Sequence, residues 1–127
     1  MPARAPLTPS GEFISNEWSS GPVAIAVTFS DRWHGLRPTP TGFGLLLKTR
    51  SVHSFGMKTT LLLVGVDARG AVVRSRTLRP GGIAIMATAR YILELEGHRS
   101  PPVMGSVLTW RGAGSTDPLR HAHRQPW

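Results

Sequence analysis

The sequence predicts a mainly β protein: a compact antiparallel β-barrel or sandwich with one short helix. Its 14 Gly and 11 Pro disfavour a helix bundle, because glycine weakens helix interiors and proline breaks them. Several short segments alternate large apolar residues with small or polar ones, which is the pattern of a half-buried strand. A chain of 127 residues, 40% of them hydrophobic, has the length and composition of one packed domain.

Three regions are expected along the chain. Residues 1–21 contain three prolines and no periodic pattern, which indicates a flexible N-terminal arm. Residues 22–110 carry the alternating segments and form the single β-rich domain. Residues 111–127 are polar and aperiodic, which is typical of a disordered C-terminal tail.

In the first part of the domain, the residue pattern predicts two strands joined by the short helix. Large apolar residues alternate with Ala and Thr over residues 23–29, which indicates a strand. Ser30 is a suitable helix N-cap, and Gly35 can adopt the left-handed conformation that ends a helix. A proline-rich loop follows, and residues 43–48 form the next strand.

The middle of the domain predicts a hairpin. Residues 51–66 form two strands or one bent strand, with Gly56 at a bulge. The apolar run within this segment, at residues 61–64, requires cover on both faces of its sheet. Asp-Ala-Arg-Gly at residues 67–70 is typical of a hairpin turn, with residues 71–78 as the returning strand.

Two further strands complete the predicted sheet. A turn at residues 79–82 precedes a segment whose pattern favours no single structure, and residues 107–110 form a last short strand. Residues 90–96 alternate in the manner of a strand. We expect its larger apolar side chains to face inward and its glutamates outward: Tyr91, Leu93 and Leu95 against Glu94 and Glu96.

The charge balance allows a polyanionic partner. Lys and Arg number 15 against 7 Asp and Glu, and a net charge of +8 attracts nucleic acid or acidic membrane surfaces. The arginines are scattered, however, and a solvated basic surface explains the same composition. With no cysteine, the chain has no disulfide framework, thiolate metal site or thiol nucleophile.

The sequence carries no signal for export or membrane insertion. The first 20 residues lack the apolar stretch of a signal peptide. The longest apolar run, residues 61–66, is far shorter than the roughly 20 residues that cross a bilayer as a helix. We therefore expect a cytoplasmic protein without a membrane span. The oligomeric state and the biological process are not predicted.

Five segments occur along the chain in a recognisable order: Asp-Arg-Trp-His-Gly-Leu at 31–36, Gly-Leu-Leu-Leu at 44–47, Ser-Val-His-Ser-Phe-Gly-Met at 51–57, the turn at 67–70 followed by Val-Val at 72–73, and Tyr-Ile-Leu-Glu-Leu at 91–95. Together, over about residues 23 to 110, they resemble the prokaryotic domain of unknown function 192 family. The resemblance implies a compact antiparallel β-barrel or sandwich with a short helix on one side. It implies no established enzymatic activity.

Two departures from the family pattern make this chain a diverged copy. The resemblance places an Asp in the strand that follows the Gly-Met pair, where this chain has Leu62. It places a second Asp after the glycine of the last turn, where this chain has Ser106. The loss of both acids leaves open whether any family activity is retained.

His53, Phe55 and Met57 form the first candidate site. Residues at i, i+2 and i+4 share one face of a strand, and a histidine beside an aromatic ring and a thioether can line a small-ligand pocket. The competing interpretation is a hydrogen-bonded histidine at the core edge, because a soft metal would find only two ligands here. The leading hypothesis is a non-catalytic binding or accessory domain for an unknown small ligand, with no cofactor.

Arg74 and Arg76 form the second candidate site. Their guanidinium groups lie on one strand face and can bind phosphate or carboxylate through paired hydrogen bonds. This arrangement supports the alternative function, a basic surface that binds polyanions or nucleic acid. An exposed edge strand protected from aggregation by its charge explains the same two residues.

No catalytic or metal-binding residue is assigned. The chain lacks a Gly-x-Ser-x-Gly elbow, and the paired carboxylates Glu94 and Glu96 would need a pocket that separates their pKa values. A diverged hydrolase is kept as the remaining alternative. His121 and His123 in the tail can chelate a divalent ion only weakly, because mobile ligands do not preorganise a site.

Overall fold

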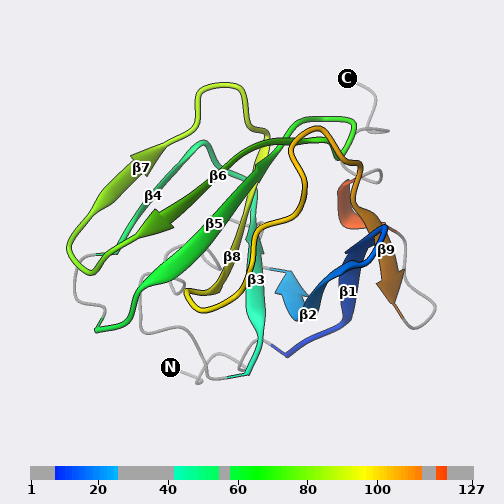
Figure 1. The fold of residues 1–127 in the computed structure, drawn as a ribbon, viewed down its shortest axis with the longest axis horizontal. Helices are drawn as coiled ribbons and strands as arrows, with labels where there is room; N and C mark the ends of the chain where they lie inside the picture. Colours follow the sequence, from blue (N-terminus) through cyan, green and yellow to red (C-terminus); the bar gives the residue numbers. More distant parts are fainter. Residues whose placement is uncertain (1–7, 26–41, 55–57, 113–116, 120–127) are drawn as a thin grey trace, which may run out of the picture.

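The computed structural model describes residues 8–25, 42–54, 58–112 and 117–119, and within them it confirms a mainly β fold (Figure 1). The predicted helical turn at residues 30–35 lies outside these ranges. The strands are β1 Gly11–Ser15, β2 Trp18–Ile25, β3 Gly44–Leu47, β4 Ser51–His53, β5 Leu61–Val66, β6 Val72–Leu78, β7 Ile83–Ile85, β8 Tyr91–Glu96 and β9 Thr109–Gly112.

Seven of these strands form one mixed sheet in the order β6-β5-β8-β3-β2-β1-β9, and β4 pairs with β7 in a second, small sheet. The expectation of a wholly antiparallel fold is wrong for one pair, because β2 and β3 run parallel. Parallel neighbours need a crossover connection of about a dozen residues or more. The 18 residues from 26 to 43 provide that length.

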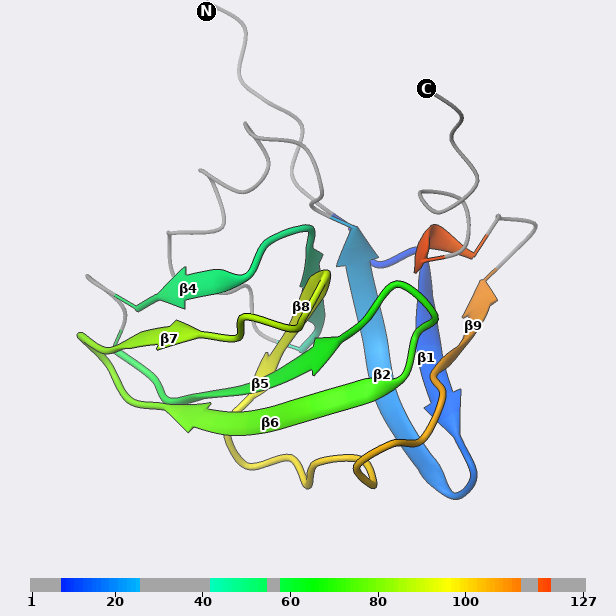
Figure 2. The same cartoon turned by 90° about the horizontal axis from the view of Figure 1, so that it is seen from above.

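The large sheet is strongly curved, and its two edges approach each other (Figure 2). An isolated bridge joins Ala71 to Val107, just before edge strands β6 and β9 respectively. Beside it, Val72 donates to the Ser106 carbonyl at 2.9 Å and Leu108 donates to the Gly70 carbonyl at 2.9 Å. The described strands nevertheless form no closed barrel, and the arrangement is that of a sandwich.

Both ends of the chain contribute more to the fold than the sequence predicts. Part of the expected flexible arm forms β1 and the start of β2, and Phe13 is fully buried against the Trp110 ring with centroids 4.9 Å apart. Asn16, with φ of 54°, makes the tight turn between the two strands. In the expected tail, β9 includes Arg111, and Leu119 is buried. Burial of these few apolar side chains explains both differences.

Two apolar cores cover the two faces of the large sheet. The first core lies between this sheet and the β4–β7 sheet, and it includes Leu45, Leu63 and Ile92 with Val52 and Ala84. A Cβ at Gly65 would lie 2.5 Å from the Met86 sulfur, so the absence of a side chain lets the segment after β7 pack onto β5.

The second core lies on the opposite face of the sheet and includes Phe13, Leu62, Leu93 and Leu119. Because both faces are covered, every residue of β5 is buried, as its continuous apolar run predicts. Leu62 is only 4% exposed. The large side chain therefore fills core space at the position where the family resemblance implies an acid.

The hairpin between β5 and β6 is confirmed. One Asp67 carboxylate oxygen accepts hydrogen bonds from the backbone amides of Arg69 at 2.9 Å and Ala71 at 3.0 Å. Gly70 has a φ of 85°, which glycine adopts without the strain that a side chain causes. The residues of the turn itself therefore supply the hydrogen bonds and the backbone conformation that the sequence predicts.

We expect Tyr91→Phe to stabilise the protein by up to about 1 kcal/mol. Tyr91 is 1% exposed in the second core, burial raises the pKa of its phenol, and its hydroxyl has no hydrogen-bond partner among the described residues. Removing this oxygen leaves the ring packing intact. Urea unfolding of both proteins tests this, and a loss of more than 1 kcal/mol would show that the hydroxyl has a bonding role.

Candidate functional site

The predicted arginine pair lies on a free edge of the large sheet. Strand β6 is an edge strand, and Arg74 and Arg76 are both exposed on it. Their cross-strand partners on β5 are Gly65 and Leu63, so both arginines project from the face that carries the first core. Arg79 is exposed in the turn that follows β6. We call Arg74, Arg76 and Arg79 the basic edge.

The buried Ser54 fixes the end of the basic edge. Its hydroxyl donates to the Arg79 carbonyl at 2.6 Å and accepts from the Gly82 amide at 2.9 Å, and its carbonyl accepts from the Gly81 amide at 3.1 Å. The turn after β6 is thereby tied to the end of β4, although 25 residues separate Ser54 from Arg79.

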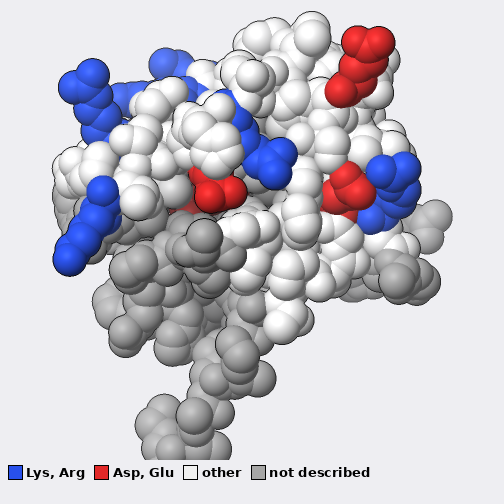
Figure 3. All heavy atoms as spheres, turned by 60° about the horizontal axis from the view of Figure 1, so that its bottom comes forward, with Lys and Arg blue, Asp and Glu red and all other residues white. Residues whose placement is uncertain are grey.

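Charge is unevenly distributed around the basic edge. In Figure 3, Lys and Arg side chains lie in the middle, on the right and along the left-hand end of the molecule, and the left-hand end is where β4, β6 and β7 are found in Figure 1. The visible Asp and Glu side chains lie in the middle and on the right. Within the described ranges, no carboxylate forms an ion pair with an arginine of the basic edge. The carboxylates of the described residues therefore leave these guanidinium groups available to an external anion.

Glu94 is buried, and the expectation that it faces outward is wrong. It lies between Leu45 of β3 and Leu63 of β5 on the first-core face, with 3% of its surface exposed. Its Oε1 has no hydrogen-bond partner in the described part of the chain. Burial raises the pKa of the carboxyl to about 8, so this group is mainly protonated at neutral pH. The β4–β7 sheet, whose packing the sequence does not predict, covers this face.

The position of Glu94 separates it from the basic edge and bears on the hydrolase hypothesis. Glu94 and Arg76 share a row of the sheet, but β5 lies between their strands, which separates their backbones by about 10 Å. Glu94 therefore does not face Arg76 across adjacent strands, and the two form no ion pair. A hydrolytic pair would require Glu94 to reach a substrate, and its burial gives no support to that alternative.

The His53 site is only partly within the described residues. His53 lies on β4, half-buried and opposite Ile83 of β7. Phe55 and Met57 lie outside the described ranges, as do the tail histidines His121 and His123. The small-ligand site formed by His53, Phe55 and Met57 therefore stays a prediction.

A groove that sequence reasoning missed lies between two turns of the chain. It brings together the turn between β1 and β2 and the turn after β8, and its walls include Trp18 and Arg99. The Trp18 Nε1–H donates to the Ser100 carbonyl at 2.7 Å. No local pattern predicts a contact between residues 82 positions apart, because it depends on how the sheet curves.

The chain matches no protein-family model and no curated protein sequence. It is similar in structure to a protein from Sinorhizobium meliloti 1021 that is named a "putative transcription regulator". The TM-score is 0.61 and the identity 19%, over 84% of this chain and 98% of that one. At this identity the likeness shows the fold alone. Within the described residues, no helix is long and apolar enough to cross a membrane.

Proposed function

We propose that this protein is a non-catalytic domain that binds the phosphate backbone of nucleic acid through the basic edge. The observation that carries the proposal is the exposure of Arg74, Arg76 and Arg79 along one strand edge and its turn, with no carboxylate paired to them in the described ranges. Backbone contacts of this kind give affinity without sequence specificity.

Arginine chemistry supports phosphate as the ligand. A guanidinium group presents N–H donors in a planar fork that fits two phosphate oxygens at once. Arg74 and Arg76 are separated by about 6.7 Å along the strand, so the pairing of β6 with β5 holds two forks in fixed register. The net charge of +8 adds long-range attraction to a polyanion.

The same positive charge would attract an acidic lipid surface. The presence of arginine rather than lysine at the basic edge favours nucleic acid over such a surface. Attraction to a lipid surface depends on the number of positive charges and makes little distinction between lysine and arginine. All three residues of the basic edge are arginine, the residue suited to bidentate phosphate contacts. Binding to vesicles rich in anionic lipid, with none to DNA, would overturn the proposal.

We expect Arg74→Gln/Arg76→Gln to weaken binding to a duplex DNA of arbitrary sequence. Loss of two phosphate contacts should reduce the slope of log affinity against log salt concentration by about 1.8, because each contact contributes about 0.9. Fluorescence anisotropy over a series of salt concentrations measures this slope.

A matched control is Arg69→Gln/Arg111→Gln, which removes the same charge at exposed positions away from the basic edge. We expect the control to change the slope by much less. Equal slopes for the two double variants would show that net charge alone drives binding. Wild-type protein that fails to bind DNA at low salt would contradict the proposal outright.

Membership of the domain of unknown function 192 family is kept as a second proposal, for a diverged copy. It assigns no activity and competes with no part of the nucleic-acid proposal. The family proposal is also independent of the small-ligand site predicted at His53, Phe55 and Met57. A thermal-shift screen of small molecules on the wild-type protein and on His53→Ala would test that site.

A further inference from the structure

A polar groove lies between the β1–β2 turn and the turn that follows β8. It has a volume of about 490 Å³ and is lined by Glu17, Trp18, Ser19, His98, Arg99 and Ser100. Trp18 and Arg99 are half-buried, whereas the other four residues are exposed. The groove thus combines an aromatic ring with a guanidinium group and is separate in sequence from the basic edge.

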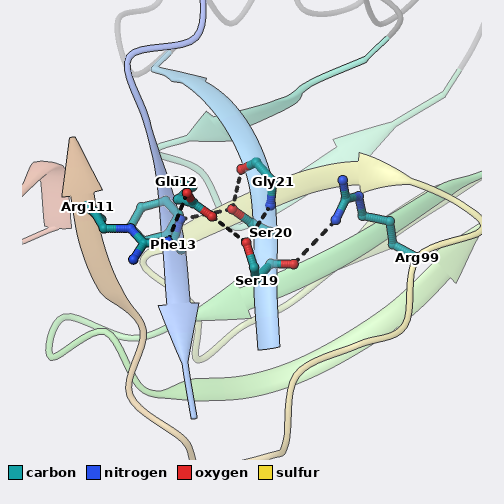
Figure 4. A network of polar contacts seen from close by, with 7 residues as sticks. All are labelled: Glu12, Phe13, Ser19, Ser20, Gly21, Arg99 and Arg111. Atoms are coloured by element: carbon teal, nitrogen blue, oxygen red, sulfur yellow. Dashed lines mark hydrogen bonds and ion pairs between the residues drawn. The ribbon is translucent and has the colours of Figure 1, made fainter. Parts of the chain in front are cut away.

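The guanidinium group of Arg99 is held in a fixed position (Figure 4). Its Nη1 donates to the Ser19 carbonyl at 3.3 Å, and its backbone amide donates to the Glu96 carbonyl at 3.1 Å. A Cβ at Gly21 would lie 2.4 Å from Nη2, so the guanidinium packs on a backbone that has no side chain there. With φ of 71°, Gly21 also has a conformation that few other residues adopt.

A second set of contacts fixes the strand beneath Arg99. The Ser19 hydroxyl donates to Glu12 and accepts from the Gly21 amide at 3.1 Å. Arg111 of β9 forms an ion pair with Glu12 at 3.2 Å. Figure 4 shows that this network links three strand segments and ends at Arg99. The Glu12 carboxylate therefore binds Ser19 and Arg111, and it forms no ion pair with Arg99.

The groove retains unused binding capacity. An arginine side chain has five N–H donors, and within the described residues only one bond from the Arg99 side chain is present. No carboxylate in those residues forms an ion pair with Arg99. The Trp18 N–H is already used by Ser100, so the remaining contribution of the indole is its apolar ring surface.

We propose that this groove binds a small molecule that carries a carboxylate on a planar apolar ring, with Arg99 binding the carboxylate and Trp18 contacting the ring. Each part of this ligand class corresponds to one wall of the groove. The exposed Glu17 carboxylate also lines the groove and would repel an anionic ligand, so its removal provides an additional test.

Benzoate is the first probe, and its binding is followed through the indole N–H signal of Trp18 in NMR titrations of the whole protein. We expect a dissociation constant on the order of 1 mM, in keeping with the small number of atoms. Benzamide, which has the ring without the charge, should bind about tenfold more weakly. Inorganic phosphate, which has charge without the ring, should also bind more weakly. Equal affinity for benzoate and either probe would overturn the proposal.

Arg99→Gln should weaken benzoate binding about tenfold, and Glu17→Gln should strengthen it about twofold. Arg69→Gln, a matched loss of charge at an exposed turn, should change nothing. Equal losses in Arg99→Gln and Arg69→Gln would contradict the proposal. If Arg99→Gln fails to fold, the comparison of benzoate with benzamide on the wild-type protein decides the question. Arg99→Gln should change the salt dependence of DNA binding by no more than the Arg69→Gln/Arg111→Gln control does, so the two proposals fail separately.

Discussion

Glu94→Gln is expected to become more stable than the wild-type protein as the pH rises, by up to about 5 kcal/mol at pH 9. The wild-type carboxyl loses its proton near pH 4.5 in the unfolded chain, whereas burial raises its pKa to about 8 in the folded protein. Between these values the folded state binds more protons than the unfolded state. Wild-type stability therefore falls as pH rises through this window, and a glutamine cannot ionise.

Urea unfolding at pH 5, 7 and 9 measures the free energy of unfolding of both proteins. The difference between the two values at each pH isolates the effect of Glu94, because all other groups titrate alike in both proteins. The two stabilities should be nearly equal at pH 5. Glu96→Gln is the matched control, because Glu96 lies two residues further along the same face and is only half-buried. Parallel pH profiles for wild type and Glu94→Gln would show that the Glu94 carboxyl is solvated or paired in solution.

Leu62→Asp is expected to cost about 4 kcal/mol or more at pH 7, enough to unfold a domain of ordinary stability. Leu62 is 4% exposed in the second core, where a carboxylate would lose its hydration and gain apolar neighbours. The substitution introduces the acid that the family resemblance implies at this position. Thermal unfolding followed by circular dichroism measures the loss.

Thr77→Asp is the matched control for Leu62→Asp. Thr77 lies directly opposite Leu62 on β6 and is exposed, so an acid at this position should change stability by less than about 0.5 kcal/mol. A Leu62→Asp protein as stable as the Thr77→Asp protein would mean that position 62 is open to solvent. The two-sided burial of β5 would then be wrong.

Those parts of the fold that depend on local sequence could be predicted. The β5–β6 hairpin follows from Asp67 and Gly70, whose side-chain acceptor and positive φ act within the turn itself. The apolar run of β5 likewise indicates cover on both faces wherever the covering elements come from. In both cases the physical cause lies within a few residues of the pattern.

Features that depend on distant packing could not be predicted. Glu94 follows the alternation of an outward position, but the β4–β7 sheet covers that face and buries it. Phe13 lies in a segment without a periodic pattern, so the sequence does not predict a strand there, and its contact with Trp110 places β1 in the sheet. The groove at Arg99 joins two turns that only the curved sheet brings together.

The candidate arginines could be predicted as a pair, because residues at i and i+2 on a strand share a face in any sheet. An exposed edge strand is one interpretation of this pair from the sequence, and the strand order, which ends at β6, establishes it. The sequence does not show that Ser54 holds Arg79 at the end of the same edge. The sequence therefore gives the chemistry of the site, and its accessibility comes from the topology.

The most direct test of the proposed function is an NMR titration with a short DNA duplex at low salt, observed through the Nε–H signals of the arginine side chains. If the basic edge binds DNA, the signals of Arg74, Arg76 and Arg79 shift together and saturate, while those of Arg69 and Arg111 remain unchanged. Shifts of similar size in all arginines, or saturation at Arg69 and Arg111 with none at β6, would contradict it.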